Sequence, residues 1–145
     1  MTYFDQTLEC APREQIESRQ GRLFLSLMEK LEKKNLFYTE KLNRAGLSFE
    51  DIQSLEDLQK VPFTSKSELM EAQEQSPPFG TNLTFPESAY TRFHQTSGTT
   101  GVPLRVLDTE ESWKWWGHCW GFVMAAAGLT CLLYTSDAAD ERLGV

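Results

Sequence analysis

Cysteine is scarce in this sequence of 145 residues, which contains only Cys10, Cys119 and Cys131. These positions lack the C-x-x-C spacing of zinc and redox motifs, and an odd, sparse set does not build a disulfide framework. His94 and His118 do not complete a metal-ligand pattern with the cysteines. We therefore expect a reducing compartment, no disulfide scaffold and no metal site.

Basic residues are also in the minority, with 14 Lys and Arg against 21 Asp and Glu, giving a formal net charge of −7. Such a surface repels nucleic-acid phosphates and anionic lipids, so we expect neither nucleic acid nor membrane as a partner. The most apolar stretch, Cys119–Tyr134, is too short for a typical membrane span and is broken by Gly121 and Gly128. Met1–Asp5 lacks the basic and apolar character of a signal peptide, which favours a cytoplasmic location.

The N-terminal part carries helical signals. A stripe at helical spacing predicts a helix over about Arg13–Lys34; its members are Ile16, Leu23, Leu27 and Leu31, with Phe24 and Met28 beside them. A second helix is predicted over about Leu36–Ala45, burying Phe37, Leu42 and Ala45 and ending at Gly46. A short third helix is predicted over about Leu55–Gln59, and a fourth near Ser65, where Ser65 and Glu68 form a capping box. Ser76–Gly80 is predicted as a loop.

The pattern changes after Pro86. Tyr90–Gln95 and Leu104–Leu107 have strand propensity, and a helix is predicted over about Thr109–Ala127 with Asp108 and Glu111 at its start. One face of this helix carries Trp113, Trp116 and Trp120, which we interpret as core packing rather than as the wall of a ligand pocket. A helical beginning followed by strand–loop–strand–helix predicts an α/β protein.

The loop between the two strands is the strongest chemical signal. It contains only Ser, Thr and Gly, in the order Thr96, Ser97, Gly98, Thr99, Thr100 and Gly101. The glycines allow close backbone approach and positive φ, successive N–H groups can surround an anion, and the hydroxyls add donors without bulk. These are the requirements for binding a polyphosphate, although composition alone favours a flexible hairpin loop.

Two other phosphate-binding classes are disfavoured. The loop is not a Walker A motif, because no Lys-Ser or Lys-Thr follows Gly101. A kinase-like phosphotransferase would need acidic metal ligands near the loop, and the sequence offers none there. His94, two residues before the loop, fits either a contact to nucleotide or acyl group or a structural hydrogen bond.

The order of the loop residues, S-G-T-T-G followed by x-Pro, resembles the signature loop of the adenylate-forming superfamily. Other segments resemble the phenylacetate–CoA ligase branch in order and approximate spacing across Tyr3–Thr130. They are Tyr3-Phe4-Asp5, Glu9, Pro12-Arg13-Glu14, Arg22-Leu23, Phe37-Tyr38, Lys41-Leu42, Ala45-Gly46-Leu47, Ser54–Leu58 and Val61–Lys66. The loop is moderately specific to the superfamily, and the combined set is fairly specific to this branch.

The resemblance implies an ATP-dependent, AMP-forming ligase that adenylates a carboxylic acid, expected to be aromatic, and then forms a CoA thioester. It implies ATP, Mg²⁺ and CoA as cofactors and places Thr96–Gly101 on the ATP phosphates. One departure stands out: many superfamily members carry Lys after the Pro of the loop, where this sequence has Leu104 followed by Arg105. Arg105 supplies the cationic contact, or the phosphates lack it; both alternatives stay open here.

The resemblance also predicts how the chain is organised. Residues 1–85 would form the helical part of the large domain, and residues 86–130 the start of the AMP-binding core. Residues 131–145 are expected to be foreign, because Cys131–Glu141 matches an in-frame translation of a common sequencing-library adapter. We therefore expect the N-terminal fragment of a ligase, inactive by itself; the alternative is a small, complete, non-enzymatic α/β binding module.

Overall fold

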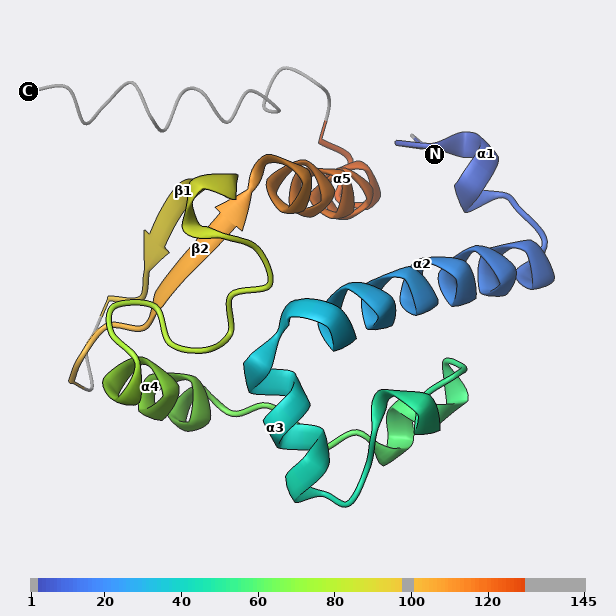
Figure 1. Cartoon of the computed structure of the whole chain (residues 1–145). Helices are drawn as coiled ribbons and strands as arrows, with labels where there is room; N and C mark the ends of the chain where they lie inside the picture. The colour runs from blue at the N-terminus through green and yellow to red at the C-terminus, as the bar shows by residue number, and fades with distance from the viewer. Residues whose placement is uncertain (1–2, 98–100, 130–145) are drawn as a thin grey trace, which may run out of the picture. The chain divides into compact units, whose positions relative to one another are not determined.

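The computed structural model describes residues 3–97 and 101–129 (Figure 1). They fall into two compact units, one formed by residues 3–12 with 112–129 and the other by Arg13–Glu111. Helices precede a two-stranded antiparallel sheet and a further helix. The expected α/β class is confirmed for this part of the chain.

The larger unit begins with three helices, α2 (Arg13–Lys34), α3 (Leu36–Arg44) and α4 (Lys66–Gln75). The short 3-10 helices η1 (Phe49–Asp51) and η2 (Glu56–Lys60) lie between α3 and α4. η3 (Glu87–Ala89) precedes the strands. The predicted bounds of α2 are confirmed, and the third predicted helix is present as the 3-10 helix η2.

Local signals in the sequence account for the ends of these helices. Gly46 follows α3 with φ of 71°, a conformation that other residues adopt at a cost. Ser65 caps α4 by accepting a hydrogen bond from the Glu68 N–H, while the Glu68 carboxylate accepts one from the Ser65 N–H at 2.7 Å. The predicted capping box is therefore confirmed.

The core of the larger unit lies among α2, α3 and η1. Its buried members are Phe24, Leu31, Leu42, Phe49 and Ile52, with Leu42 and Ile52 only 2% and 1% exposed. The predicted stripe of α2 was wrong in part, because Leu23 and Leu27 are 43% and 50% exposed. α2 buries the neighbouring stripe through Phe24 and Leu31 instead. Ala45, predicted as buried, is exposed.

Asn35, between α2 and α3, is 2% exposed, and both polar atoms of its side chain, Oδ1 and Nδ2, are hydrogen-bonded. Its Oδ1 accepts from the Tyr38 N–H at 3.0 Å and so caps α3. Its Nδ2 donates to the Asn82 carbonyl oxygen at 3.1 Å and to Thr84 Oγ1 at 2.9 Å. This buried amide ties the start of α3 to the segment that precedes the sheet.

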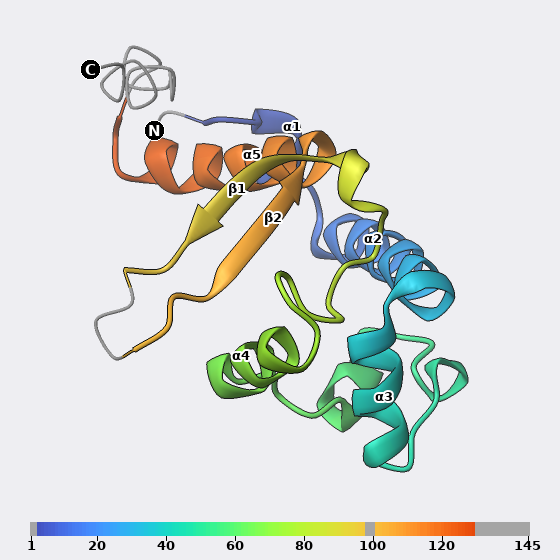
Figure 2. The same cartoon turned by 60° about the vertical axis from the view of Figure 1, so that its left-hand side comes forward.

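The sheet consists of β1 (Tyr90–Gln95) and β2 (Arg105–Thr109). The strands pair antiparallel, with Phe93 opposite Leu107 and Gln95 opposite Arg105. Both views show β1 and β2 side by side (Figures 1 and 2). The predicted bounds of β1 are confirmed, whereas β2 starts and ends later than predicted.

The helix α5 (Glu110–Ala126) continues directly from β2 and forms most of the smaller unit. Asp108, predicted to cap this helix, lies inside β2 instead. α1 (Gln6–Glu9) belongs to the same unit, where the Phe4 ring packs against His118 and Phe122 with centroid distances of 5.3 and 5.2 Å. Among the residues that the structure describes, no helix is long and apolar enough to cross a membrane.

The three tryptophans do share one helix face. Trp113 stacks on Trp116 at a centroid distance of 5.1 Å, and Trp116 lies 5.5 Å from Trp120. Core packing was nevertheless the wrong interpretation for this chain, because Trp116 and Trp120 are 52% and 41% exposed. Helical spacing predicts which residues share a face but not whether a partner covers it.

Candidate functional site: the Ser/Thr/Gly loop and its hairpin

The hairpin closes between Thr96, the first residue of the Ser/Thr/Gly loop, and Leu104, which follows Gly101, Val102 and Pro103. The Thr96 N–H donates to the Leu104 carbonyl oxygen at 3.0 Å, and the Leu104 N–H donates to Thr96 Oγ1 at 3.0 Å. We call this pair of hydrogen bonds between Thr96 and Leu104 the neck of the loop. The Thr96 hydroxyl oxygen already acts as an acceptor in it. Its remaining O–H can still donate to a ligand.

The other predicted site residues divide into described and undescribed ones. Gly98, Thr99 and Thr100 lie outside the residues that the structure describes. Ser97 is exposed at the start of the loop. Gly101 has φ of 135°, which L side chains rarely adopt, so the glycine is needed for backbone conformation at the end of the loop. A Cβ atom there would meet no heavy atom within 4 Å.

Leu104 and Arg105 stand where the resemblance places a lysine. Leu104 is 8% exposed, and its side chain packs inside the protein. The Arg105 guanidinium donates through Nη1 to the Pro78 carbonyl oxygen at 3.1 Å.

The side chains of the hairpin alternate between two faces of the sheet. Phe93 lies on one face and packs against Phe79 at a centroid distance of 6.4 Å. The residues His94 and Asp108 lie on the other face, where His94 Nε2 and Asp108 Oδ2 are 3.6 Å apart. His94 is therefore placed on the sheet face beside a carboxylate, in agreement with a structural or a site role.

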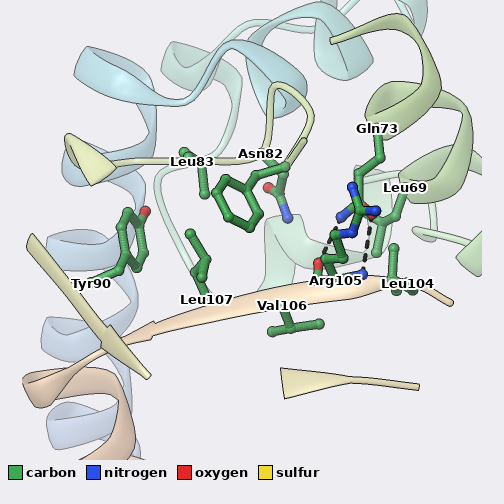
Figure 3. A pocket seen from close by; sticks show the side chains of 10 residues that line it. Leu69, Gln73, Asn82, Leu83, Tyr90, Leu104, Arg105, Val106 and Leu107 are labelled. Atoms are coloured by element: carbon green, nitrogen blue, oxygen red, sulfur yellow. Dashed lines mark hydrogen bonds between the residues drawn. The ribbon is translucent and has the colours of Figure 1, made fainter. Parts of the chain in front are cut away.

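A pocket of about 160 Å³ lies between α4, the segment around residues 79–83 and β2 (Figure 3). Its wall is mainly apolar, with Gln73, Asn82 and Arg105 as polar members. In Figure 3, Gln73 reaches from α4 to the backbone of β2, and Leu107 points into the pocket while Val106 points away. The pocket thus lies beside β2, the strand that follows the loop.

Gln73 is the site residue that the sequence did not indicate. Its Nε2 donates to the Arg105 carbonyl oxygen at 2.6 Å, and its Oε1 accepts from the Arg105 N–H at 3.1 Å. A glutamine on an amphipathic helix is typical of a solvated face. No spacing or motif distinguishes it, because its partner lies 32 residues away.

The donor set of the described loop residues suits an anion better than a metal ion. Backbone N–H groups and hydroxyl protons stabilise phosphate oxygens, whereas Mg²⁺ requires oxygen acceptors, commonly carboxylates and phosphates. Within residues 3–97 and 101–129, no group of at least three His, Cys, Asp or Glu side chains could hold a metal ion.

Comparison with known proteins decides the relationship. The chain is 33% identical over 121 residues to a phenylacetate–coenzyme A ligase of Thermus thermophilus, covering 83% of this chain and 26% of the relative. It is 34% identical over 91 residues to the enzyme of the same name from Escherichia coli, covering 63% of this chain and 20% of that protein. The chain is related to the phenylacetate–coenzyme A ligases. No family model matches it.

Solved structures agree with this relationship. A 2-hydroxyisobutyryl-CoA ligase in complex with 2-HIB-AMP superposes with a TM-score of 0.70 at 25% identity, over 81% of this chain and 24% of that chain. The same ligase with 2-HIB-AMP and CoA, in its thioesterification state, gives 0.69 at 28% identity, over 78% of this chain and 24% of that chain. The chain thus has the fold of part of an adenylate-forming CoA ligase.

The chain matches only part of the length of its relatives. The chain spans about a quarter of the length of the phenylacetate–coenzyme A ligase of Thermus thermophilus. Its described residues contain the hairpin that flanks the Ser/Thr/Gly loop and the helices that precede it in the sequence.

Proposed function

We propose that this chain provides the phosphate-binding part of an ATP-dependent, AMP-forming acid–CoA ligase. The observation that carries the proposal is a Ser/Thr/Gly loop closed by Thr96 and Leu104, in a chain related to phenylacetate–coenzyme A ligases. In the complete reaction the acid carboxylate attacks the α-phosphate of ATP, and acyl-AMP and pyrophosphate form. The CoA thiol then displaces AMP to give the thioester.

In this proposal, different groups of the loop have different roles in binding ATP. The backbone N–H groups and hydroxyls of Thr96–Gly101 would hold the phosphates, and Mg²⁺ would add positive charge on the phosphate oxygens. Gly101 gives the backbone the freedom to turn out of the loop. The names of the relatives favour an aromatic acid such as phenylacetate as the substrate.

The proposal includes an organisation of the chain. Residues 1–85 are the helical part of the large ligase domain, and residues 86–130 are the beginning of its AMP-binding core. Residues 131–145 lie outside the native protein and come from the adapter. Resequencing the locus with a library method that lacks this adapter tests the last point, because a genomic reading frame that encodes Cys131–Asp137 would contradict it.

The function is tested on the protein encoded by the contiguous genomic frame beyond residue 130. We expect acid-dependent pyrophosphate exchange with ATP, nearly abolished by Gly98→Val because a side chain blocks backbone approach to the phosphates. Thr99→Ala should cost about 1–3 kcal/mol of transition-state stabilisation, typical of a hydrogen bond to a charged group. Unchanged exchange in Gly98→Val would remove the loop from the site.

A genuine stop codon in the native frame near residue 130 would favour the alternative function, a small non-enzymatic binding module.

A further inference from the structure

Gln73 occupies a position that a neighbouring strand would fill in a wider sheet. In an antiparallel pair, successive residues direct their N–H and C=O groups alternately toward and away from the partner strand. Leu104 directs its groups to Thr96 across the hairpin. The groups of Arg105 therefore point to the outer edge of β2, and the Gln73 carboxamide binds both of them, at 2.6 and 3.1 Å.

The primary amide of Gln73 acts here as a substitute for a peptide group. It offers one donor and one acceptor in the arrangement of a backbone unit, and α4 carries it to the strand edge. Arg105 is held a second time, because its guanidinium donates to the Pro78 carbonyl oxygen at 3.1 Å. These contacts fix the strand one residue after the neck of the phosphate loop.

We propose that Gln73 is a positioning residue for phosphate binding, which acts by clamping the exit strand of the loop to α4. The inference rests on the proposed function. The neck sets the separation of the loop ends through Thr96 and Leu104, and the clamp sets where that neck lies relative to α4. Gln73 itself touches no phosphate. Its contribution is to hold the described ends of the loop, at Thr96 and Leu104, in one place before the nucleotide arrives, which is a form of preorganisation.

Alternative roles of the side chain predict different behaviour. A glutamine that only improves the solubility of α4 would have no effect on Arg105. A glutamine that only stabilises the fold would change the unfolding temperature without a selective change in ATP binding. A clamp changes the exchange of the Arg105 amide and the ATP dependence of the reaction together.

The first experiment uses the 145-residue chain and measures backbone amide exchange by NMR. In Gln73→Ala, the Arg105 amide should exchange about tenfold faster, because it loses one hydrogen bond. Gln73→Glu keeps an acceptor for the Arg105 N–H but places a carboxylate against the Arg105 carbonyl, so we expect an intermediate rate. The matched control is Gln75→Ala on the same helix, whose amide donates to Glu71 at 3.0 Å, and it should leave Arg105 unchanged. Wild-type exchange in Gln73→Ala would overturn the clamp.

The second experiment separates positioning from stability in the protein of the full genomic frame. Gln73→Ala should raise the KM for ATP in pyrophosphate exchange about tenfold, with a smaller change in kcat and an unfolding midpoint close to that of the Gln75→Ala control. An unchanged KM, with faster Arg105 exchange, would make Gln73 a structural residue only and overturn the positioning role. If the wild-type protein exchanges no pyrophosphate with any acid, the proposed ligase function fails, and amide exchange still decides whether the clamp exists.

Discussion

The ammonium group of Lys41 on α3 makes an ion pair and hydrogen bond with the carboxylate of Glu68 on α4. Only 8% of the Lys41 side chain is exposed, against 37% for Glu68. A buried ammonium requires a partner, since removing its counter-charge leaves an uncompensated charge away from water. Glu68 also belongs to the capping box of α4, so one carboxylate holds a helix start and a neighbouring helix.

This pair predicts a pH dependence of stability. The hydrogen bond from Lys41, followed by those from the Ser65 N–H and hydroxyl, lowers the pKa of Glu68 from 4.5 to about 2. Because the folded pKa is depressed, the stabilisation is fully present above pH 4.5 and is lost as the pH falls toward about 2. Thermal unfolding followed by circular dichroism across this range should show a falling midpoint.

Glu68→Gln should lower the midpoint at pH 7 and flatten the acid dependence, because the variant no longer carries the titrating group. The matched control is Glu71→Gln on the same helix, whose carboxylate accepts a hydrogen bond from Gln75. It should retain the acid dependence of the wild type. Equal curves for the two variants would contradict the role of the Lys41–Glu68 pair.

Two glycines should respond to the same substitution with opposite signs. Gly21 lies inside α2, and a Cβ there meets no heavy atom within 4 Å, so Gly21→Ala should stabilise the chain by about 0.5–1 kcal/mol. Gly46 has φ of 71°, so Gly46→Ala should destabilise it by about 1–2 kcal/mol. Urea denaturation of both variants checks the signs. Stabilisation by Gly46→Ala would show that α3 ends differently.

The buried face of α2 and α3 is tested by two leucines. Leu42 is 2% exposed in the core, so Leu42→Ala should cost about 2–5 kcal/mol in the free energy of unfolding. Leu27 is 50% exposed, so Leu27→Ala should cost less than about 1 kcal/mol. Similar costs for the two variants would indicate that Leu27 is buried, as the helical spacing of α2 first predicted.

The 145-residue chain should release no pyrophosphate with ATP, Mg²⁺, phenylacetate and CoA. Catalysis needs the acid and the α-phosphate aligned at near-attack distance, and the chain spans about a quarter of its relative from Thermus thermophilus. A coupled pyrophosphate assay against a Gly98→Val control measures this. Turnover above the control would show that this chain is a functional enzyme.

Local signals made part of the fold predictable. The glycine after α3 and the capping box of Ser65 and Glu68 act within a few residues, so the sequence indicates them directly. The face of α2 was harder, because Leu23 and Phe24 belong to overlapping apolar stripes and only the partner helix selects one. Lys41 appears as a solvated residue on a helix until Glu68, 27 residues later, is placed beside it.

The site shows the same division. The loop could be found from residue order, because six consecutive Ser, Thr and Gly residues are a local pattern. The neck contact between Thr96 and Leu104 follows from the strands on either side. The clamp by Gln73 could not be predicted, since it depends on how α4 is placed against β2, and no periodicity encodes that placement.

The buried Asn35 has a consequence for covalent modification. Its amide binds the Asn82 carbonyl oxygen and Thr84 Oγ1, and Asn82-Leu83-Thr84 is an acceptor sequence for N-linked glycosylation. A glycosyl transferase needs this segment free and extended, but the native structure holds it against the start of α3. If the chain were directed into a secretory pathway, sugar on Asn82 would mark molecules that had been modified before folding. Such a glycan would crowd the contacts of Asn35 with Asn82 and Thr84, whereas the cap of α3 itself, from the Tyr38 N–H to Asn35 Oδ1, is local.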